Sequence, residues 1–144
     1  MKRKLPAILL IAAIVSTLVL TGCQAPNPAS LSNDQVVQVV DNILKAISAG
    51  DFQSFTQDFS DSMASNFTEA QFISLAELLK KASGNYVSCA DTSPEISNSQ
   101  GYAVYRLTCK YELENVIVTV TFLEGGEKVE GLFFDSTNLR KVSQ

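Results

Sequence analysis

The chain has 144 residues and a formal net charge of −4 at pH 7, and it contains no histidine. The missing histidine removes the commonest general base, the commonest zinc ligand and the hydrolase triads, so we expect no complete catalytic constellation, no metal site and no cofactor. The acidic balance argues against nucleic acid, which requires a basic footprint. This length suits one small domain with a modest core.

The first residues predict an export signal. Lys2, Arg3 and Lys4 precede an uncharged, mainly apolar stretch over residues 5–20. A helix of about 16 residues spans roughly 24 Å, which is short of the roughly 30 Å hydrocarbon core of a bilayer. We therefore expect residues 1–22 to be a cleaved signal peptide instead of a permanent transmembrane helix.

The quartet Leu20-Thr21-Gly22-Cys23 follows that stretch directly. It resembles the lipobox of bacterial lipoprotein signals, and the resemblance implies that the Cys23 thiol receives a diacylglyceryl group and becomes the first residue. Residues 23–31 then form a lipidated tether on the extracytoplasmic face of the cell membrane. The alternative is an ordinary secretory signal that happens to contain a cysteine.

Removal of the signal changes the charge of the chain. Residues 1–22 hold three basic and no acidic residues, so the remaining 122 residues carry a net charge of −7. Such a surface is repelled by anionic lipid, which makes the acyl chains the main membrane attachment.

Three helices are expected after the tether. The first lies between Ser32 and Gly50, the second follows Asp51, and the third lies between Thr68 and Gly84. The serine and the threonine each have glutamine at the third helical position, which completes a capping box. Glycine suits the left-handed position that ends a helix.

Beyond residue 85 the hydrophobic period changes to two. Strands are expected over residues 86–90, 102–113, 116–123 and 129–135, with a turn-rich loop over residues 91–101. The predicted fold class is therefore α+β, with three N-terminal helices packed on a curved, four-stranded antiparallel sheet that forms a cone.

Two turns define the expected register of this sheet. We expect two-residue turns at Gly125-Gly126 and at Glu114-Asn115. Both turns place apolar residues on one shared face, with the pairs Phe122–Val129, Val120–Gly131, Val118–Phe133 and Tyr111–Val118. The outer face keeps an apolar set that a homodimer partner, a tail or a second protein would cover: Ile117, Leu123, Leu132 and Phe134.

Cys89 and Cys109 are the two cysteines that remain once Cys23 is lipidated. They lie on consecutive predicted strands, and they face each other if the loop between them is centred near Ser99. Outside the cytoplasm such a pair favours a disulfide, which contributes roughly 3 kcal/mol in the chain-entropy estimate. The alternative is a pair of buried free thiols.

Residues 33–140 resemble a known family in the order and spacing of four short motifs. These motifs are Gly50-Asp51-Phe52, Thr68-Glu69-Ala70-Gln71, Gly84-Asn85-Tyr86 and Val129-Glu130-Gly131-Leu132-Phe133-Phe134. They are similar to the domain of unknown function 3887 family, within the nuclear transport factor 2-like superfamily. The resemblance implies a single cone-like (cystatin-like) α+β domain over residues 32–144 and a secreted location, and it carries no catalytic residues.

Our first functional hypothesis is a non-catalytic module that binds a small apolar ligand or an envelope protein. Six aromatic residues are candidates for the lining of a pocket in the cone, and an ordinary core is the alternative for all of them: Phe52, Phe55, Phe59, Phe67, Tyr105 and Tyr111.

The second hypothesis is an isomerase- or dehydratase-like enzyme with a carboxylate base and a tyrosine donor. Its candidates are Asp51, Asp58 and Asp61 with Tyr86, Tyr105 and Tyr111. The first aspartate is equally well placed as a helix cap and the other two lie in a polar turn, so we favour the binding module. The third hypothesis is a structural subunit that dimerises through the outer face of the sheet.

Overall fold

The computed structural model describes residues 31–90 and 95–142. The predicted signal peptide, Cys23 and nearly all of the tether lie outside these residues. Within the described part of the chain, no helix is both long and apolar enough to cross a membrane.

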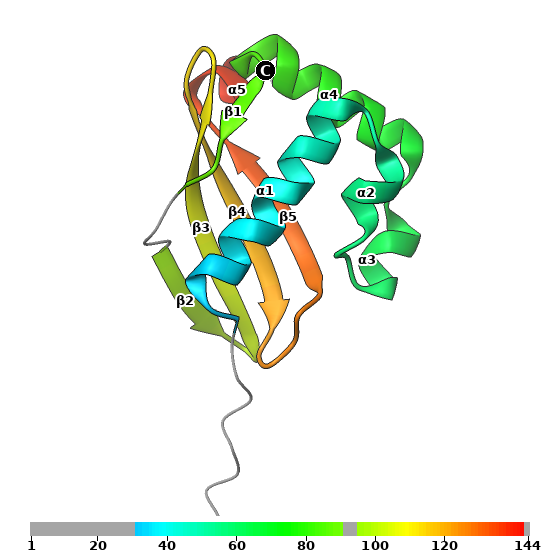
Figure 1. Ribbon diagram of the computed structural model, residues 1–144, viewed down its shortest axis with the longest axis vertical. Coiled ribbons are helices and arrows are strands. Elements are labelled where there is room, and N and C mark those ends of the chain that lie inside the picture. The colour runs from blue at the N-terminus through cyan, green and yellow to red at the C-terminus, as the bar shows by residue number, and fades with distance from the viewer. Residues whose placement is uncertain (1–30, 91–94, 143–144) are drawn as a thin grey trace, which may run out of the picture.

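The described residues form five helices and five strands, and the strands make an open antiparallel sheet (Figure 1). The helices are α1 Asn33–Ala49, α2 Phe52–Thr56, α3 Asp61–Asn66, α4 Glu69–Ser83 and α5 Thr137–Val142. The strands are β1 Tyr86–Ser88, β2 Glu95–Ser99, β3 Tyr102–Tyr111, β4 Asn115–Leu123 and β5 Val129–Asp135. The α+β class is confirmed, whereas the predicted counts of three helices and four strands are too low.

The helix starts at the two predicted capping boxes are confirmed by their hydrogen bonds. The Ser32 hydroxyl accepts a hydrogen bond from the Gln35 amide at 3.3 Å, and the Gln35 carboxamide accepts one from the Ser32 amide at 2.9 Å. Thr68 and Gln71 repeat this arrangement at the start of α4. Gly50 ends α1 with a φ of 71°, a left-handed conformation that suits glycine.

The two short helices α3 and α5 are not among the predicted elements. The Ser60 hydroxyl caps α3 by accepting from the Met63 amide at 3.2 Å, and the Ser136 hydroxyl accepts from the Leu139 amide at 3.1 Å at the start of α5. Each helix has six residues. Six residues make fewer than two helical turns, so apolar residues recur too few times on one face to reveal a helical period in the sequence.

The strand β3 pairs along both of its edges. The sheet order is β1-β3-β4-β5, and β2 also pairs with β3. Because β4 occupies one edge of β3, the strands β1 and β2 share the other edge, along successive stretches. The strand β2 replaces part of the predicted loop 91–101. Its hairpin turn is Gln100-Gly101, with φ values of 52° and 83°, as a type I′ turn requires.

The predicted two-residue turn at Glu114-Asn115 is wrong. The last pair of β3 and β4 is Lys110–Asn115, so the turn covers residues 111–114 and begins at the final residue of β3. Val118 therefore pairs with Leu107 instead of Tyr111. The offset is an even number of residues, so the same side chains face the core as in the predicted register.

Contacts outside the hairpin explain this longer turn. The Glu112 amide donates to the Asn85 carbonyl at 3.0 Å, and the Leu113 amide donates to the Ser83 carbonyl at 3.0 Å. The amides of Glu112 and Leu113 are therefore bonded to the segment between α4 and β1, and they are not available to extend the pairing of β3 with β4.

The hairpin between β4 and β5 contains a bulge. The predicted pair Phe122–Val129 is confirmed, but the pairing then skips Glu130, which is an extra residue on β5. The Ser60 hydroxyl donates to the Glu130 carboxylate at 2.9 Å. The loop before α3 thus holds the bulged residue.

The bulge reverses the face of every later residue of β5. Val118 pairs with Phe134 instead of Phe133. The predicted placement of Leu132 and Phe134 on the outer face is therefore wrong, because both pack against the core. Phe133 takes their place on the outer face and is 63% exposed, and Ile117 remains there half-buried.

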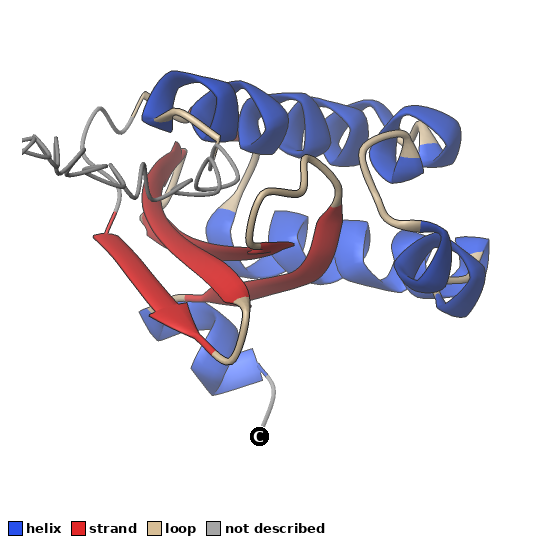
Figure 2. Ribbon diagram, turned by 90° about the horizontal axis from the view of Figure 1, so that it is seen from below, coloured by secondary structure: helices blue, strands red, loops and turns tan. Residues whose placement is uncertain are grey.

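The main core lies between α1 and the sheet. Figure 2 shows α1 across one face of the curved sheet, and Figure 1 shows α2 and α3 beside β5. Residues from both layers have no exposed surface: Val36, Val40, Leu44, Leu107, Val116, Val118 and Val120. This packing fixes the end of α1 relative to β3, which positions the cavity described below.

Candidate functional site

Cys89 and Cys109 are joined by a disulfide whose Cα atoms lie 4.3 Å apart. Cys89 follows β1, Cys109 lies on β3, and both residues are buried. The bridge lies between the stretches of β3 that pair with β1 and with β2. It therefore braces the divided edge of the sheet.

The phenylalanines of the predicted aromatic pocket pack against one another. The ring centroid of Phe55 lies 4.8 Å from that of Phe59, 5.2 Å from that of Phe67 and 4.9 Å from that of Phe72. Phe52 contacts Phe72 at 5.6 Å. These tilted and edge-on contacts form an aromatic core between α2 and α4.

The two tyrosines of that predicted set have different surroundings. Tyr105 is 2% exposed, packs against Phe122, and donates its hydroxyl to the Leu31 carbonyl at 3.2 Å. Tyr111 lines a cavity beside the C-terminal end of α1. Of the six aromatic candidates, Tyr111 is the one that lines this cavity.

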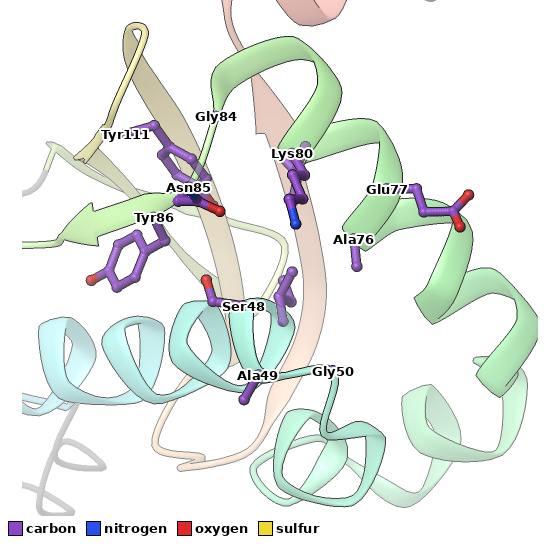
Figure 3. A pocket seen from close by; sticks show the side chains of 12 residues that line it. Ser48, Ala49, Gly50, Ala76, Glu77, Lys80, Gly84, Asn85, Tyr86 and Tyr111 are labelled. Carbon is purple, nitrogen blue, oxygen red and sulfur yellow. The ribbon is translucent and has the colours of Figure 1, made fainter.

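The cavity has a volume of about 280 Å³ and lies between the end of α1, the second half of α4 and the start of β1 (Figure 3). This size is near the lower limit for small-molecule pockets, which run from about 300 to 1,000 Å³. The glycines that end α1 and α4 both lie at its wall. Its other main contributors are Ile47, Ala76, Leu79, Lys80, Asn85 and Tyr111.

Tyr111 is the unusual residue of this wall. It is 4% exposed, and among the described residues its hydroxyl has no hydrogen-bond partner. Burial raises the pKa of the phenol well above its ordinary value, so the hydroxyl is neutral and is able to donate a hydrogen bond at neutral pH. A buried hydroxyl without a partner destabilises a folded protein.

Tyr86 lines the same cavity with its hydroxyl satisfied. It donates to the Asp41 carboxylate at 2.5 Å, and Asp41 also binds the Lys45 ammonium at 2.6 Å. The rings of Tyr86 and Tyr111 meet edge-on, with centroids 5.6 Å apart. Burial opposes the ionisation of Asp41, but the hydrogen bonds from Lys45 and Tyr86 outweigh it and lower the pKa of the carboxyl.

Lys80 supplies positive charge to the cavity. Figure 3 shows its side chain extending from α4 toward α1, with the ammonium in the space between the two helices. Glu77 also lines the wall, but its carboxylate points away from this space (Figure 3). Ile47 and Leu79 make the neighbouring wall apolar.

Comparison with protein-family models finds a match over residues 40–132, which is more than half of the chain. The matching model is described as a protein of unknown function, DUF3887. This chain belongs to the DUF3887 family. A comparison with curated proteins found no match.

The DUF3887 match contains every residue that lines the cavity, since these run from Ile47 to Tyr111. Sequence reasoning did not select Lys80 or Asn85 for this site. Lys80 lies in the last turn of α4, where a positive charge suits the negative end of the helix, but it also follows Ala76 by one helical turn and so shares its face. The four-residue spacing of Ala76 and Lys80 was the sequence signal that could have placed the two residues in the same wall.

The three aspartates of the enzyme hypothesis do not line this cavity. The Asp51 carboxylate caps α2 and accepts from the Ser54 amide at 3.0 Å. Asp61 is exposed in the first turn of α3, and Asp58 is half-buried. None of the three lines the cavity with Tyr86 or Tyr111. The described residues also hold no cluster of three or more histidine, cysteine or acidic side chains that could bind a metal.

A second hollow of about 460 Å³ lies between α4, β5 and α5. Its wall is mainly apolar and includes Phe67, Leu75, Leu78, Phe133 and Leu139. No buried polar side chain lacks a hydrogen-bond partner in this wall, as far as the described residues show. Gln71 and Ser74 also line it, but both side chains form hydrogen bonds within α4 or its cap, so the hollow offers mainly apolar contact.

Proposed function

We propose that this chain is a lipid-anchored, extracytoplasmic protein whose folded domain binds a small ligand without transforming it. The observation that carries the proposal is Tyr111, which lines a cavity and whose buried hydroxyl has no hydrogen-bond partner among the described residues. Leaving such a group unpaired costs about 1–3 kcal/mol. A ligand that accepts a hydrogen bond from the Tyr111 hydroxyl removes this cost, so the bond contributes to the free energy of binding.

The location rests on the amino-terminal sequence. The basic start, the apolar stretch and the lipobox-like Leu20-Thr21-Gly22-Cys23 support a lipid on Cys23. The disulfide between Cys89 and Cys109 agrees with an oxidising compartment. The net negative charge of the chain supports lipid, instead of surface charge, as the attachment to the membrane.

For the fold we propose the cone of the nuclear transport factor 2-like superfamily. The support is a long first helix across one face of a curved antiparallel sheet, with further helices beside its edge (Figures 1 and 2).

An enzymatic role has weaker support. A general base for chemistry near pH 7 needs a raised carboxyl pKa, whereas the pKa of Asp41, the carboxyl that contacts Tyr86, is lowered. The carboxylate of Glu77 points out of the cavity (Figure 3). We therefore prefer binding without chemistry.

A thermal-shift experiment with a matched pair of variants tests the binding proposal. The probes are small carboxylic acids, their amides, alcohols and dipeptides. We expect at least one class to raise the Tm of the protein. Ala76→Phe fills the cavity and should abolish that shift, whereas Ala70→Phe, on the exposed first turn of α4, should retain it.

Two outcomes would contradict the proposal. One is the absence of any shift across all probe classes. The other is a shift that survives Ala76→Phe, because binding would then occur elsewhere, for example in the apolar hollow beside β5.

A further inference from the structure

We infer that the ligand of this cavity is a small organic anion, with a carboxylate that bridges Lys80 and Tyr111 and an apolar body that lies against Ile47 and Leu79. This inference deepens the proposed function and rests on it. It concerns the chemical class of the ligand, which follows from the charge and the donors of the wall.

The two polar groups come from different elements. Tyr111 belongs to β3 and offers a neutral hydroxyl, while Lys80 belongs to α4 and extends its ammonium into the space between α4 and α1 (Figure 3). Both groups are donors toward an anion, and an ionised acceptor forms shorter and stronger hydrogen bonds than a neutral one. One carboxylate has two oxygens and so satisfies both donors.

The nearby acids leave the positive charge of Lys80 available. The carboxylate of Glu77 points away from the cavity (Figure 3). Glu112 interacts electrostatically with Lys80, but its carboxylate accepts from the Asn85 amide at 2.9 Å and from the Asn85 side chain at 3.0 Å. A cationic ligand would be repelled by Lys80, and no carboxylate in the described part of the cavity wall points inward to attract the ligand.

The apolar part of the wall limits the rest of the ligand. Ile47 and Leu79 are 6% and 1% exposed, and Ala76 lies beside them. A cavity of about 280 Å³ accepts a short alkyl chain or one aromatic ring. Its volume is just below the range of about 300–1,000 Å³ that is usual for pockets that bind drug-sized compounds. Hexanoate and phenylacetate have this composition.

Calorimetric titration of the full chain with these acids and their amides tests the inference. Hexanoate and phenylacetate should bind at least about tenfold more tightly than hexanamide and phenylacetamide, since the amides lose the charge-assisted bond. Lys80→Gln should weaken hexanoate about tenfold and leave hexanamide unchanged. Lys81→Gln, the neighbouring lysine that does not line the cavity, should change neither affinity.

Tyr111→Phe separates the second donor. It should weaken both hexanoate and hexanamide, because each offers an oxygen to the hydroxyl. Equal binding of acids and amides, or an unchanged hexanoate affinity in Lys80→Gln, would overturn the anionic class and leave the binding function standing. Failure of every probe class in the thermal-shift panel would overturn both.

Discussion

Two tyrosines of the cavity wall differ in one property. The Tyr86 hydroxyl donates to an ionised carboxylate, whereas the Tyr111 hydroxyl lacks a partner among the described residues. Removal of an unpaired buried hydroxyl should stabilise the ligand-free protein, so Tyr111→Phe should raise the free energy of unfolding by about 1 kcal/mol. Tyr86→Phe breaks a hydrogen bond to a charged group and should lower that free energy by about 2 kcal/mol.

Urea unfolding of the wild type and of the two variants measures both effects, with binding probes absent. The same atom is removed in each variant, so the opposite signs depend on the hydrogen-bond partner alone. A loss of stability in Tyr111→Phe comparable to that in Tyr86→Phe would show that the Tyr111 hydroxyl is satisfied in solution.

Glu114 illustrates a second residue-level effect. Its carboxylate accepts from the Ser83 hydroxyl at 2.7 Å, the Ser136 hydroxyl at 2.6 Å and the Asn138 amide at 3.2 Å. Burial opposes its ionisation, but these hydrogen bonds and the charge of Lys141 outweigh burial and lower the pKa of the carboxyl. The ionised group therefore joins the β3–β4 turn to the ends of α4 and α5.

A pH series tests this role. Because the pKa of Glu114 is lower in the folded protein than in the unfolded chain, its contribution is full above the ordinary glutamate range and is lost as pH falls through the folded pKa. Glu114→Gln should lower the free energy of unfolding by about 1–2 kcal/mol at pH 7. The difference from the wild type should shrink as the pH falls below about 4.

The exposed Glu127→Gln is the matched control for that series. It should change stability by less than about 0.5 kcal/mol at either pH. A difference between Glu114→Gln and the wild type that stays constant down to pH 3 would contradict the ionic role.

At the scale of elements, the divided edge of β3 depends on the disulfide. The strand β1 has three residues and is too short to be stable by its own pairing. Replacement of Cys89 and Cys109 by alanine should lower the free energy of unfolding by roughly 3 kcal/mol. Thermal unfolding with and without a reductant checks this value, and a wild-type Tm that is unaffected by full reduction would contradict it.

The elements also show what the sequence could predict. Capping residues and alternating apolar residues act over a few positions, so α1, α4 and β3–β5 were predictable from the chain alone. The bulge at Glu130 and the turn at residues 111–114 depend on partners distant in sequence, such as Ser60 and Asn85. Local pattern contains no information about those partners.

The same distinction applies to the candidate site. Tyr111 was predictable as an inward residue because it continues the alternation of β3. Its unpaired hydroxyl and the approach of Lys80 follow from the relative placement of α1, α4 and β1, which no short-range rule supplies. The aromatic residues in and after α2 are evident in the sequence, but only the structure shows that their rings pack against one another in the core.

At the scale of the whole molecule, the domain is proposed to act at a membrane through Cys23. Cys23→Ser should move the protein from the membrane fraction to the soluble fraction and abolish labelling by a radioactive fatty acid, because one acylated residue supplies the anchor. The Ala70→Phe variant should stay in the membrane fraction. Unchanged membrane association of Cys23→Ser would contradict the lipid anchor.

The central claim is that the cavity between α1, α4 and β1 is a binding site with Tyr111 as its internal donor. A crystal structure of the protein grown with phenylacetate tests this claim most directly. We predict density for the ligand in the cavity, with a carboxylate oxygen about 3 Å from the Tyr111 hydroxyl. Phenylacetate bound in the apolar hollow beside β5, with the cavity holding only water, would contradict it.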